Sequence, residues 1–105
     1  MTSPGNGTHR FEVHCSAAIT DTIRQIHRRA WRQGRGNAVT RAFRQIIQRL
    51  ALHPFQVGEP YYRLPGMRLQ VRSCCVSPLV VHFAVSEDRY LVFIKAVRLL
   101  PGKET

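Results

Sequence analysis

Residues 46–72 read IIQRLALHPFQVGEPYYRLPGMRLQVR, and the hydrophobic pattern changes from helical to strand-like within this stretch. Upstream of His53-Pro54 the apolar residues recur every three or four positions, which is the spacing of one helix face. Because a residue that precedes proline is kept out of the helical region, we expect the helix to end at this dipeptide. Downstream, residues 67–72 alternate between apolar and polar side chains, which is the period of a strand. We therefore expect the helices to lie before His53-Pro54 and most of the strands to lie after it.

Two helices are predicted upstream of His53. The first is expected to follow Ser16, a residue type that caps helix N-termini. Its apolar stripe consists of Ile19, Ile23, Ile26 and Ala30. It ends at Gly34-Arg35-Gly36-Asn37, which joins a C-terminal glycine signal to a new N-cap. The apolar face of the second helix consists of Val39, Phe43, Ile46, Ile47 and Leu50. Helices joined by so short a loop pack as an antiparallel hairpin.

One short strand precedes the helices, at residues 11–15, and three strands are expected after them. Residues 61–64 lead into a turn at Pro65-Gly66, and residues 74–78 form a connection. The later strands are expected at 67–72, 79–85 and 89–98. The order β-α-α-β-β-β defines an α+β fold, in which a helical hairpin packs on one face of a small, mostly antiparallel sheet. The first strand must join this sheet, because a lone strand leaves its backbone groups unpaired.

The length of 105 residues suits a single domain, which we assign to residues 9–100. Residues 1–8 are rich in Gly, Pro, Ser and Thr and are expected to form a disordered leader, and residues 101–105 a frayed tail. No run of about 20 apolar residues is present, so we expect no membrane span. The N-terminal residues also lack the apolar segment of a signal peptide. We therefore expect a cytoplasmic protein with no membrane partner.

The charge is strongly positive. Sixteen Lys and Arg residues oppose six Asp and Glu residues, which gives a net charge of +10 and favours a polyanionic partner. The sequence has no Asp or Glu between Thr22 and Gly58, so one helical row of arginines has no acidic partner in reach. The predicted nucleic-acid contacts are Arg24, Arg28 and Arg32 of this row, together with Arg63. The alternatives are a solvated helix face, an acidic protein partner, and a GC-rich genome that favours arginine codons.

The three cysteines do not indicate a metal site or a disulfide framework. Cys74 and Cys75 are adjacent, Cys15 is distant, and no Cys-x-x-Cys pair occurs. The five histidines also lack the spacing of metal ligands. We predict no metal and no other cofactor.

The chain resembles the RelE/ParE superfamily of toxins from bacterial type II toxin–antitoxin pairs. The resemblance covers residues 9–100 and rests on the element order and on four segments, LALHP at 50–54, LPGMRLQVR at 64–72, HFAV at 82–85 and LVFIKAV at 91–97. It implies a toxin that either cleaves messenger RNA on the ribosome or inhibits DNA gyrase. It also implies a cognate antitoxin that wraps the toxin.

In the ribonuclease branch, the resemblance places basic residues on an exposed face of the sheet. Arg68 and Arg72 match that basic row, and Arg98 lies near the C-terminal end of the last strand. The chain departs from the family at Val80, where an arginine is expected, and after Arg98, where Leu99-Leu100-Pro101 replaces a His or Tyr. These departures leave the enzymatic activity, a metal-independent endoribonuclease, open.

Cleavage by attack of the RNA 2′-hydroxyl needs an acid, a base and cations that stabilise charge on phosphorus. The predicted catalytic residues are Arg68, Arg72, His82 and Arg98, with His82 as acid or base because its reference pKa lies near neutrality. The alternatives without a catalytic role are a half-buried structural histidine for His82 and a solvated face of an amphipathic strand for Arg68 and Arg72.

Two aromatic features complete the set. Tyr61 and Tyr62 are adjacent and should face opposite ways in a strand, one toward the core. Trp31 lies beside the arginine row, where it can stack on a base, seat a partner, or cap the hairpin.

Two other functions stay open, a non-catalytic nucleic-acid-binding module and an inactive toxin-fold protein.

Overall fold

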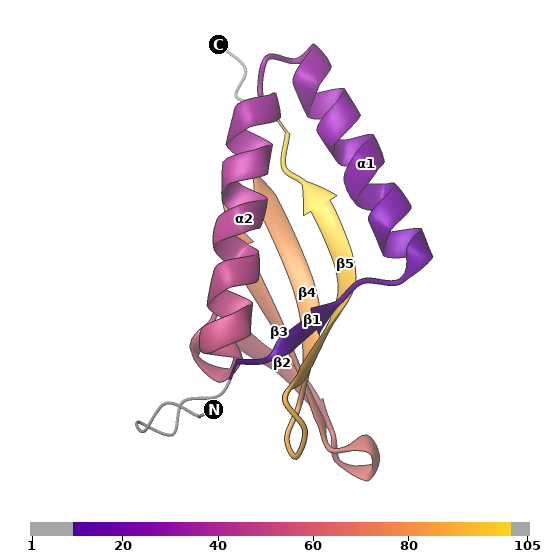
Figure 1. Ribbon diagram of the computed structural model, residues 1–105, viewed down its shortest axis with the longest axis vertical. Helices are drawn as coiled ribbons and strands as arrows, with labels where there is room; N and C mark the ends of the chain where they lie inside the picture. Colours follow the sequence, from indigo (N-terminus) through magenta and orange to yellow (C-terminus); the bar gives the residue numbers. More distant parts are fainter. Residues whose placement is uncertain (1–9, 102–105) are drawn as a thin grey trace.

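The computed structural model describes residues 10–101, which form a two-helix hairpin over one face of a five-stranded sheet (Figure 1). The helices are α1 (Ala17–Arg32) and α2 (Gly36–Leu52), and the strands are β1 (Glu12–His14), β2 (Glu59–Leu64), β3 (Leu69–Val76), β4 (Leu79–Ser86) and β5 (Leu91–Leu99). The predicted α+β class is confirmed. The predicted leader at 1–8, and residues 102–105 of the tail, lie outside the described residues.

The helix boundaries follow the predicted signals. The Ser16 hydroxyl accepts a hydrogen bond from the Ile19 amide, at 3.2 Å, and so caps α1 as expected. Gly34, with φ of +74°, carries the chain out of α1, and α2 begins at Gly36. At the other end, His53 leaves the helical region before Pro54, which starts a short 3-10 turn (Pro54–Gln56). Neither helix in residues 10–101 is long and apolar enough to cross a membrane.

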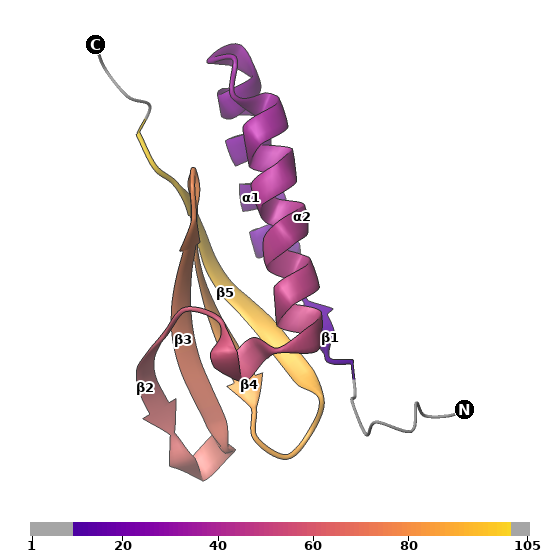
Figure 2. The ribbon, with the colours of Figure 1, turned by 90° about the vertical axis from the view of Figure 1, so that its left-hand side faces the viewer.

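The sheet has the order β1-β5-β4-β3-β2. β1 pairs in parallel with β5, which confirms that the N-terminal strand joins the sheet, and all other pairs are antiparallel. The structure adds one strand to the predicted order, because residues 59–64 pair with β3 as an edge strand, β2 (Figure 2). Residues 74–76, predicted as a connection, instead extend β3 to Val76, and the turn to β4 follows at Ser77-Pro78.

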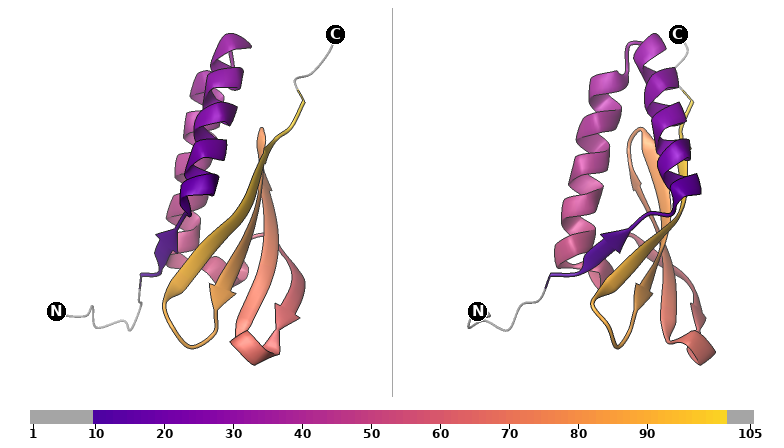
Figure 3. Two further views of the ribbon diagram at one scale, coloured as in Figure 1. Left: turned by 90° about the vertical axis from the view of Figure 1, so that its right-hand side faces the viewer. Right: turned by 45° about the vertical axis from the view of Figure 1, so that its right-hand side comes forward.

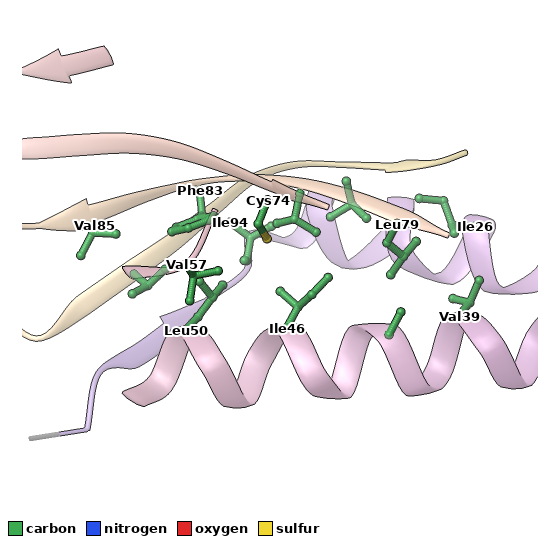
Figure 4. Packing of buried hydrophobic residues seen from close by; sticks show 14 of the residues in the cluster. Ile26, Val39, Ile46, Leu50, Val57, Cys74, Leu79, Phe83, Val85 and Ile94 are labelled. Carbon is green, nitrogen blue, oxygen red and sulfur yellow. The ribbon is translucent and has the colours of Figure 1, made fainter. Parts of the chain in front are cut away.

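The hydrophobic core lies between the sheet and the inner sides of the helices (Figure 4). The helices contribute Ile26, Ile46 and Leu50, and every second residue of β4 faces them, namely Leu79, Val81, Phe83 and Val85. Full burial of one such aliphatic or aromatic side chain stabilises the fold by about 1.5–3 kcal/mol. Both helices lie on one side of the sheet, so its other face is left without a helix (Figure 3). We call this second surface the outer face.

Gly58 positions β2 against β3. Its φ is +67°, in the left-handed region that glycine adopts without strain, and a Cβ at this position would overlap the carbonyl oxygen of Ser73. Only a glycine therefore lets the chain that enters β2 approach the β3 backbone this closely.

We expect Gly58→Ala to destabilise the protein by about 2 kcal/mol or more, because the left-handed backbone alone costs about 1–2 kcal/mol and the overlap forces β2 outward. The measurement is the urea midpoint of unfolding by circular dichroism. Gly66→Ala is the matched control, since its φ is not positive and no neighbouring atom would meet the added Cβ. Equal midpoints for the two variants would contradict this role of Gly58.

Candidate nucleic-acid interface

The register of the sheet decides which side chains reach the outer face. His82, in β4, lies opposite Ser73 of β3 and Ala96 of β5. Its neighbour Phe83 is fully buried in the core, and successive strand residues point to opposite faces. His82 therefore projects from the outer face, near the middle of the sheet.

Both tyrosines of β2 also lie on the outer face. The Tyr61 ring lies 5.6 Å from the His82 ring and 5.2 Å from the Tyr62 ring, measured between centroids. The prediction that one tyrosine enters the core is wrong, since the side chains are 66% and 48% exposed. The reason is a β-bulge between Pro60 and Tyr62, which inserts Tyr61 as an unpaired residue and breaks the alternation.

His82 is half-buried beside Tyr61, and one of its two ring nitrogens is enclosed by the protein. Its Nδ1 atom is buried and has no hydrogen-bond partner among the described residues. Most buried polar side-chain atoms in native proteins have such a partner, so this one calls for an explanation. Because Nδ1 is buried, Nε2 is the ring nitrogen through which His82 can exchange a proton with a molecule bound on the outer face.

Two cations of β5 flank His82. Arg98 pairs with Val80, two residues from His82 along β4, and is exposed on the same face. Lys95 lies in a second bulge, where the pairing shifts between His82 and Phe83, and is also exposed. Sequence reasoning identified Arg98 but missed Lys95. The bulge that exposes Lys95 could have been inferred from the pair Lys95-Ala96, which lies between the apolar residues Ile94 and Val97. Two non-core residues in a row break the period of a strand.

One carboxylate reaches the same face. Glu59 lies at the start of β2 opposite Ser73, which in turn lies opposite His82. It is exposed, and it was not singled out by sequence reasoning. The part of the outer face around His82 therefore combines its imidazole with two phenol rings, two cations and a carboxylate.

The expectation that Arg72 lies on an exposed face is wrong. Its side chain is only 7% exposed and points to the helix side, because its register partner is the core residue Phe83. The guanidinium donates from Nε to the Val57 carbonyl at 3.0 Å and from Nη2 to the Gly58 carbonyl at 3.2 Å. A third hydrogen bond goes to the Gln70 side chain. Arg72 therefore fastens the segment that enters β2 to β3.

Arg68 and Arg63 lie at the far end of the sheet from His82. Arg68 ends a 3-10 turn (Pro65–Met67) with φ of +53°, outside β3, and its Nε lies 3.4 Å from an Asp88 oxygen. Arg63 donates two hydrogen bonds to Glu87 and thereby holds the pKa of that carboxyl below its usual value. Both arginines link the β2–β3 end to the β4–β5 turn, about 13 Å from His82 along the strands.

The predicted arginine row of α1 lies away from the outer face. Arg24, Arg28 and Arg32 are exposed on the helical hairpin. Arg24 does have an acidic partner, since its Nη1 lies 3.6 Å from an Asp21 oxygen one helical turn earlier, and this corrects the expectation of an unpaired row. The structure does not bring the row and His82 to one surface, so they do not form one nucleic-acid site.

In residues 10–101 no cluster of three or more His, Cys, Asp or Glu side chains is arranged to hold a metal ion. The cysteines are free, and burial raises the pKa of the Cys74 thiol. Comparison with known proteins finds no match, neither to a family model, nor to a curated protein, nor to a solved structure.

Substitutions at Arg72 and Arg98 are expected to have different effects on the free energy of unfolding. Arg72→Ala leaves the Val57 and Gly58 carbonyls without their donor, and we expect a loss of about 1–3 kcal/mol in the free energy of unfolding. Arg98→Ala removes an exposed side chain and should change that free energy by less than about 0.5 kcal/mol. Urea titration followed by circular dichroism measures both, and an unchanged Arg72→Ala midpoint would contradict the structural role.

Proposed function

We propose that the protein is a RelE/ParE-like toxin of a type II toxin–antitoxin pair, and that its outer face binds and cleaves RNA without a metal. The observation that carries the proposal is the contact between His82 and Tyr61 on the face that no helix covers, with Tyr62, Lys95 and Arg98 around it. The fold class, a two-helix hairpin on a mostly antiparallel sheet, agrees with the one expected for that superfamily and adds support, although the sheet has one strand more than the expected order.

The aromatic pair and the cations suit a single RNA strand. Bases stack on exposed aromatic rings whatever their sequence, and each stacked base contributes about 1–3 kcal/mol to binding. Tyr61 and Tyr62 offer two such rings side by side. Lys95 and Arg98, on the strand beyond His82, would hold the phosphates of a strand that crosses the sheet from β2 to β5.

His82 supplies the proton transfer in this proposal. It takes the proton of a 2′-hydroxyl, and the 2′-oxygen then forms a bond to the adjacent phosphorus. The bond from phosphorus to the 5′-oxygen breaks, and the departing oxygen takes a proton from water, which leaves a 2′,3′-cyclic phosphate. Arg98 and Lys95 stabilise the additional negative charge on phosphorus in the transition state. DNA, which lacks the 2′-hydroxyl, would bind but not react.

The proposed partners follow from the same assignment. The substrate is messenger RNA, read on the ribosome in the cytoplasm, and the antitoxin is a separate chain. Gyrase inhibition is the less favoured branch, because it makes no use of a histidine placed among aromatic and cationic groups.

The second candidate function is a non-catalytic nucleic-acid-binding module. One observation favours it, namely that Arg68 lies at the far end of the sheet and Arg72 on the helix side, which leaves two cations, Lys95 and Arg98, near His82. Such a module would bind RNA with an affinity that falls steeply as salt rises, because each phosphate contact releases counterions.

We expect induced expression of the protein in a bacterial host to arrest growth and to create new messenger RNA ends, detected by primer extension. His82→Ala should lower the rate of RNA cleavage by about 10²–10⁴-fold, since it removes the proton carrier, while the fold persists. His53→Ala is the matched control, because His53 is exposed at the end of α2 and away from the outer face.

The alternatives give different outcomes in the same assay. Growth arrest without new RNA ends would point to gyrase and overturn the ribonuclease assignment. Folded protein that binds RNA without arrest would favour the binding module. Equal cleavage by the His82→Ala and His53→Ala variants would remove His82 from the mechanism.

A further inference from the structure

A small pocket opens at the edge of the sheet, where β3 continues past the start of β2. The pairing of β2 with β3 begins at Glu59, opposite Ser73, whereas β3 runs on to Val76 (Figure 2). The pocket has a volume of about 360 Å³, which lies within the range of sites that hold small molecules. The lining side chains with polar or reactive groups are Arg49, His53, Gln56, Cys74 and Cys75.

The two cysteines of the pocket differ in exposure. Cys75 is exposed, whereas Cys74 is only 6% exposed and packs in the core. Successive strand residues point to opposite faces, so a pocket lined by both wraps around the open edge of β3. Burial raises the pKa of the Cys74 thiol, which has no hydrogen bond within residues 10–101. Cys75 is therefore the nucleophile that a molecule in the pocket meets.

The pocket also carries groups that attract anions. Arg49 and His53 are exposed at the C-terminal end of α2 and line the pocket. Arg49 forms no ion pair with a described carboxylate, and its guanidinium opposes the rise in the pKa of Cys74, so its charge acts on the thiols. No Asp or Glu is among the lining residues. The pocket thus combines an accessible thiol with positive charge that has no counter-ion there.

We propose that Cys75 is a site of reversible S-thiolation by a small disulfide that carries carboxylates, such as glutathione disulfide, and that this pocket binds it. The Cys75 thiolate attacks one sulfur of the disulfide. A bond forms between Cys75 and one glutathione unit, the original S–S bond breaks, and the other unit leaves as a thiolate that takes up the proton released by Cys75. Arg49 and His53 hold the carboxylates of the attached unit.

The geometry disfavours a disulfide within the chain. Cys74 and Cys75 point to opposite faces of one strand, so their sulfurs face apart. Cys15 follows β1, and two strands, β5 and β4, separate β1 from β3. That separation exceeds the reach of a disulfide, which needs Cα atoms within about 7 Å. An external thiol compound is therefore the partner that Cys75 requires for oxidation.

The modification would reach the proposed ribonuclease site. Cys75 lies opposite Val80, which in turn lies opposite Arg98. His82 is two residues from Val80, so Cys75 and His82 are diagonal neighbours on the outer face, at about 7–8 Å. A tripeptide attached to Cys75 would cover the surface where RNA is proposed to lie. This consequence rests on the proposed function, whereas the modification does not.

Mass spectrometry of the reduced protein after incubation with glutathione disulfide tests the site. We expect one glutathionyl group per chain, located on Cys75 by peptide mapping. Cys75→Ser should abolish this adduct, whereas Cys15→Ser, which removes the other exposed cysteine, should retain it. An adduct chiefly on Cys15 or Cys74 would overturn the assignment. Peptide mapping of the wild-type protein gives this answer even if a variant does not fold.

The role of the pocket is tested with a neutral disulfide, bis(2-hydroxyethyl) disulfide. The ratio of modification rates with the anionic and the neutral disulfide cancels the intrinsic reactivity of each thiol. We expect this ratio to be at least about threefold higher at Cys75 than at Cys15. Arg49→Gln should remove the difference, whereas Arg41→Gln, an exposed position of α2 outside the pocket, should keep it. Equal ratios in the wild-type protein, or equal effects of the two variants, would overturn binding by the pocket.

A separate assay tests the consequence for the outer face. We expect RNA cleavage to fall when Cys75 is thiolated and to recover with dithiothreitol, while the Cys75→Ser variant is insensitive to glutathione disulfide. Full cleavage by the thiolated protein would overturn this consequence. No cleavage by the reduced protein would overturn the proposed function and leave the S-thiolation site supported by its mapped adduct.

Discussion

The alternation of β4 is the constraint on which the rest of the structure depends. Phe83 and its alternate neighbours in this strand fill the core beneath both helices, and a shift of register by one residue would expose all of them. The same alternation forces His82 to the other side, opposite Ser73 and Ala96. The position of the proposed functional histidine is thus a consequence of core packing, and it does not depend on any polar contact of its own.

A second set of contacts fixes the position of β2 at the edge of the sheet. Arg72 reaches back to the carbonyls of Val57 and Gly58, and Gly58 allows the close approach to Ser73. Together they fix where β2 starts. The bulge that follows then turns Tyr61 toward His82. An arginine that looked like a phosphate ligand in the sequence therefore contributes to the site by positioning the strand that holds its aromatic side chains.

The sequence was sufficient for the helices and the fold class, because helical spacing, the Ser16 cap and Pro54 act locally. It was insufficient for β3, where apolar residues were assumed to face the core. Val71 instead lies on the outer face, opposite Tyr62 and Ala84, and is still only 2% exposed. Arg72, the next residue in β3, therefore points to the helix side of the sheet. β2 was missed for a related reason, since its bulge removes the period that identifies a strand.

The excess positive charge is divided between two surfaces of different chemistry. On the outer face, Lys95 and Arg98 accompany aromatic rings and a histidine on a sheet that no helix covers. On the hairpin, Arg28 and Arg44 border an apolar groove between α1 and α2. Net charge draws polyanions toward the whole molecule without choosing between these surfaces. The choice comes from the neutral groups, because stacked rings accept a nucleic-acid base, whereas a floor such as that formed by Phe43 accepts an aliphatic side chain. The two surfaces of this basic chain therefore differ in the kind of anionic molecule that each can accommodate.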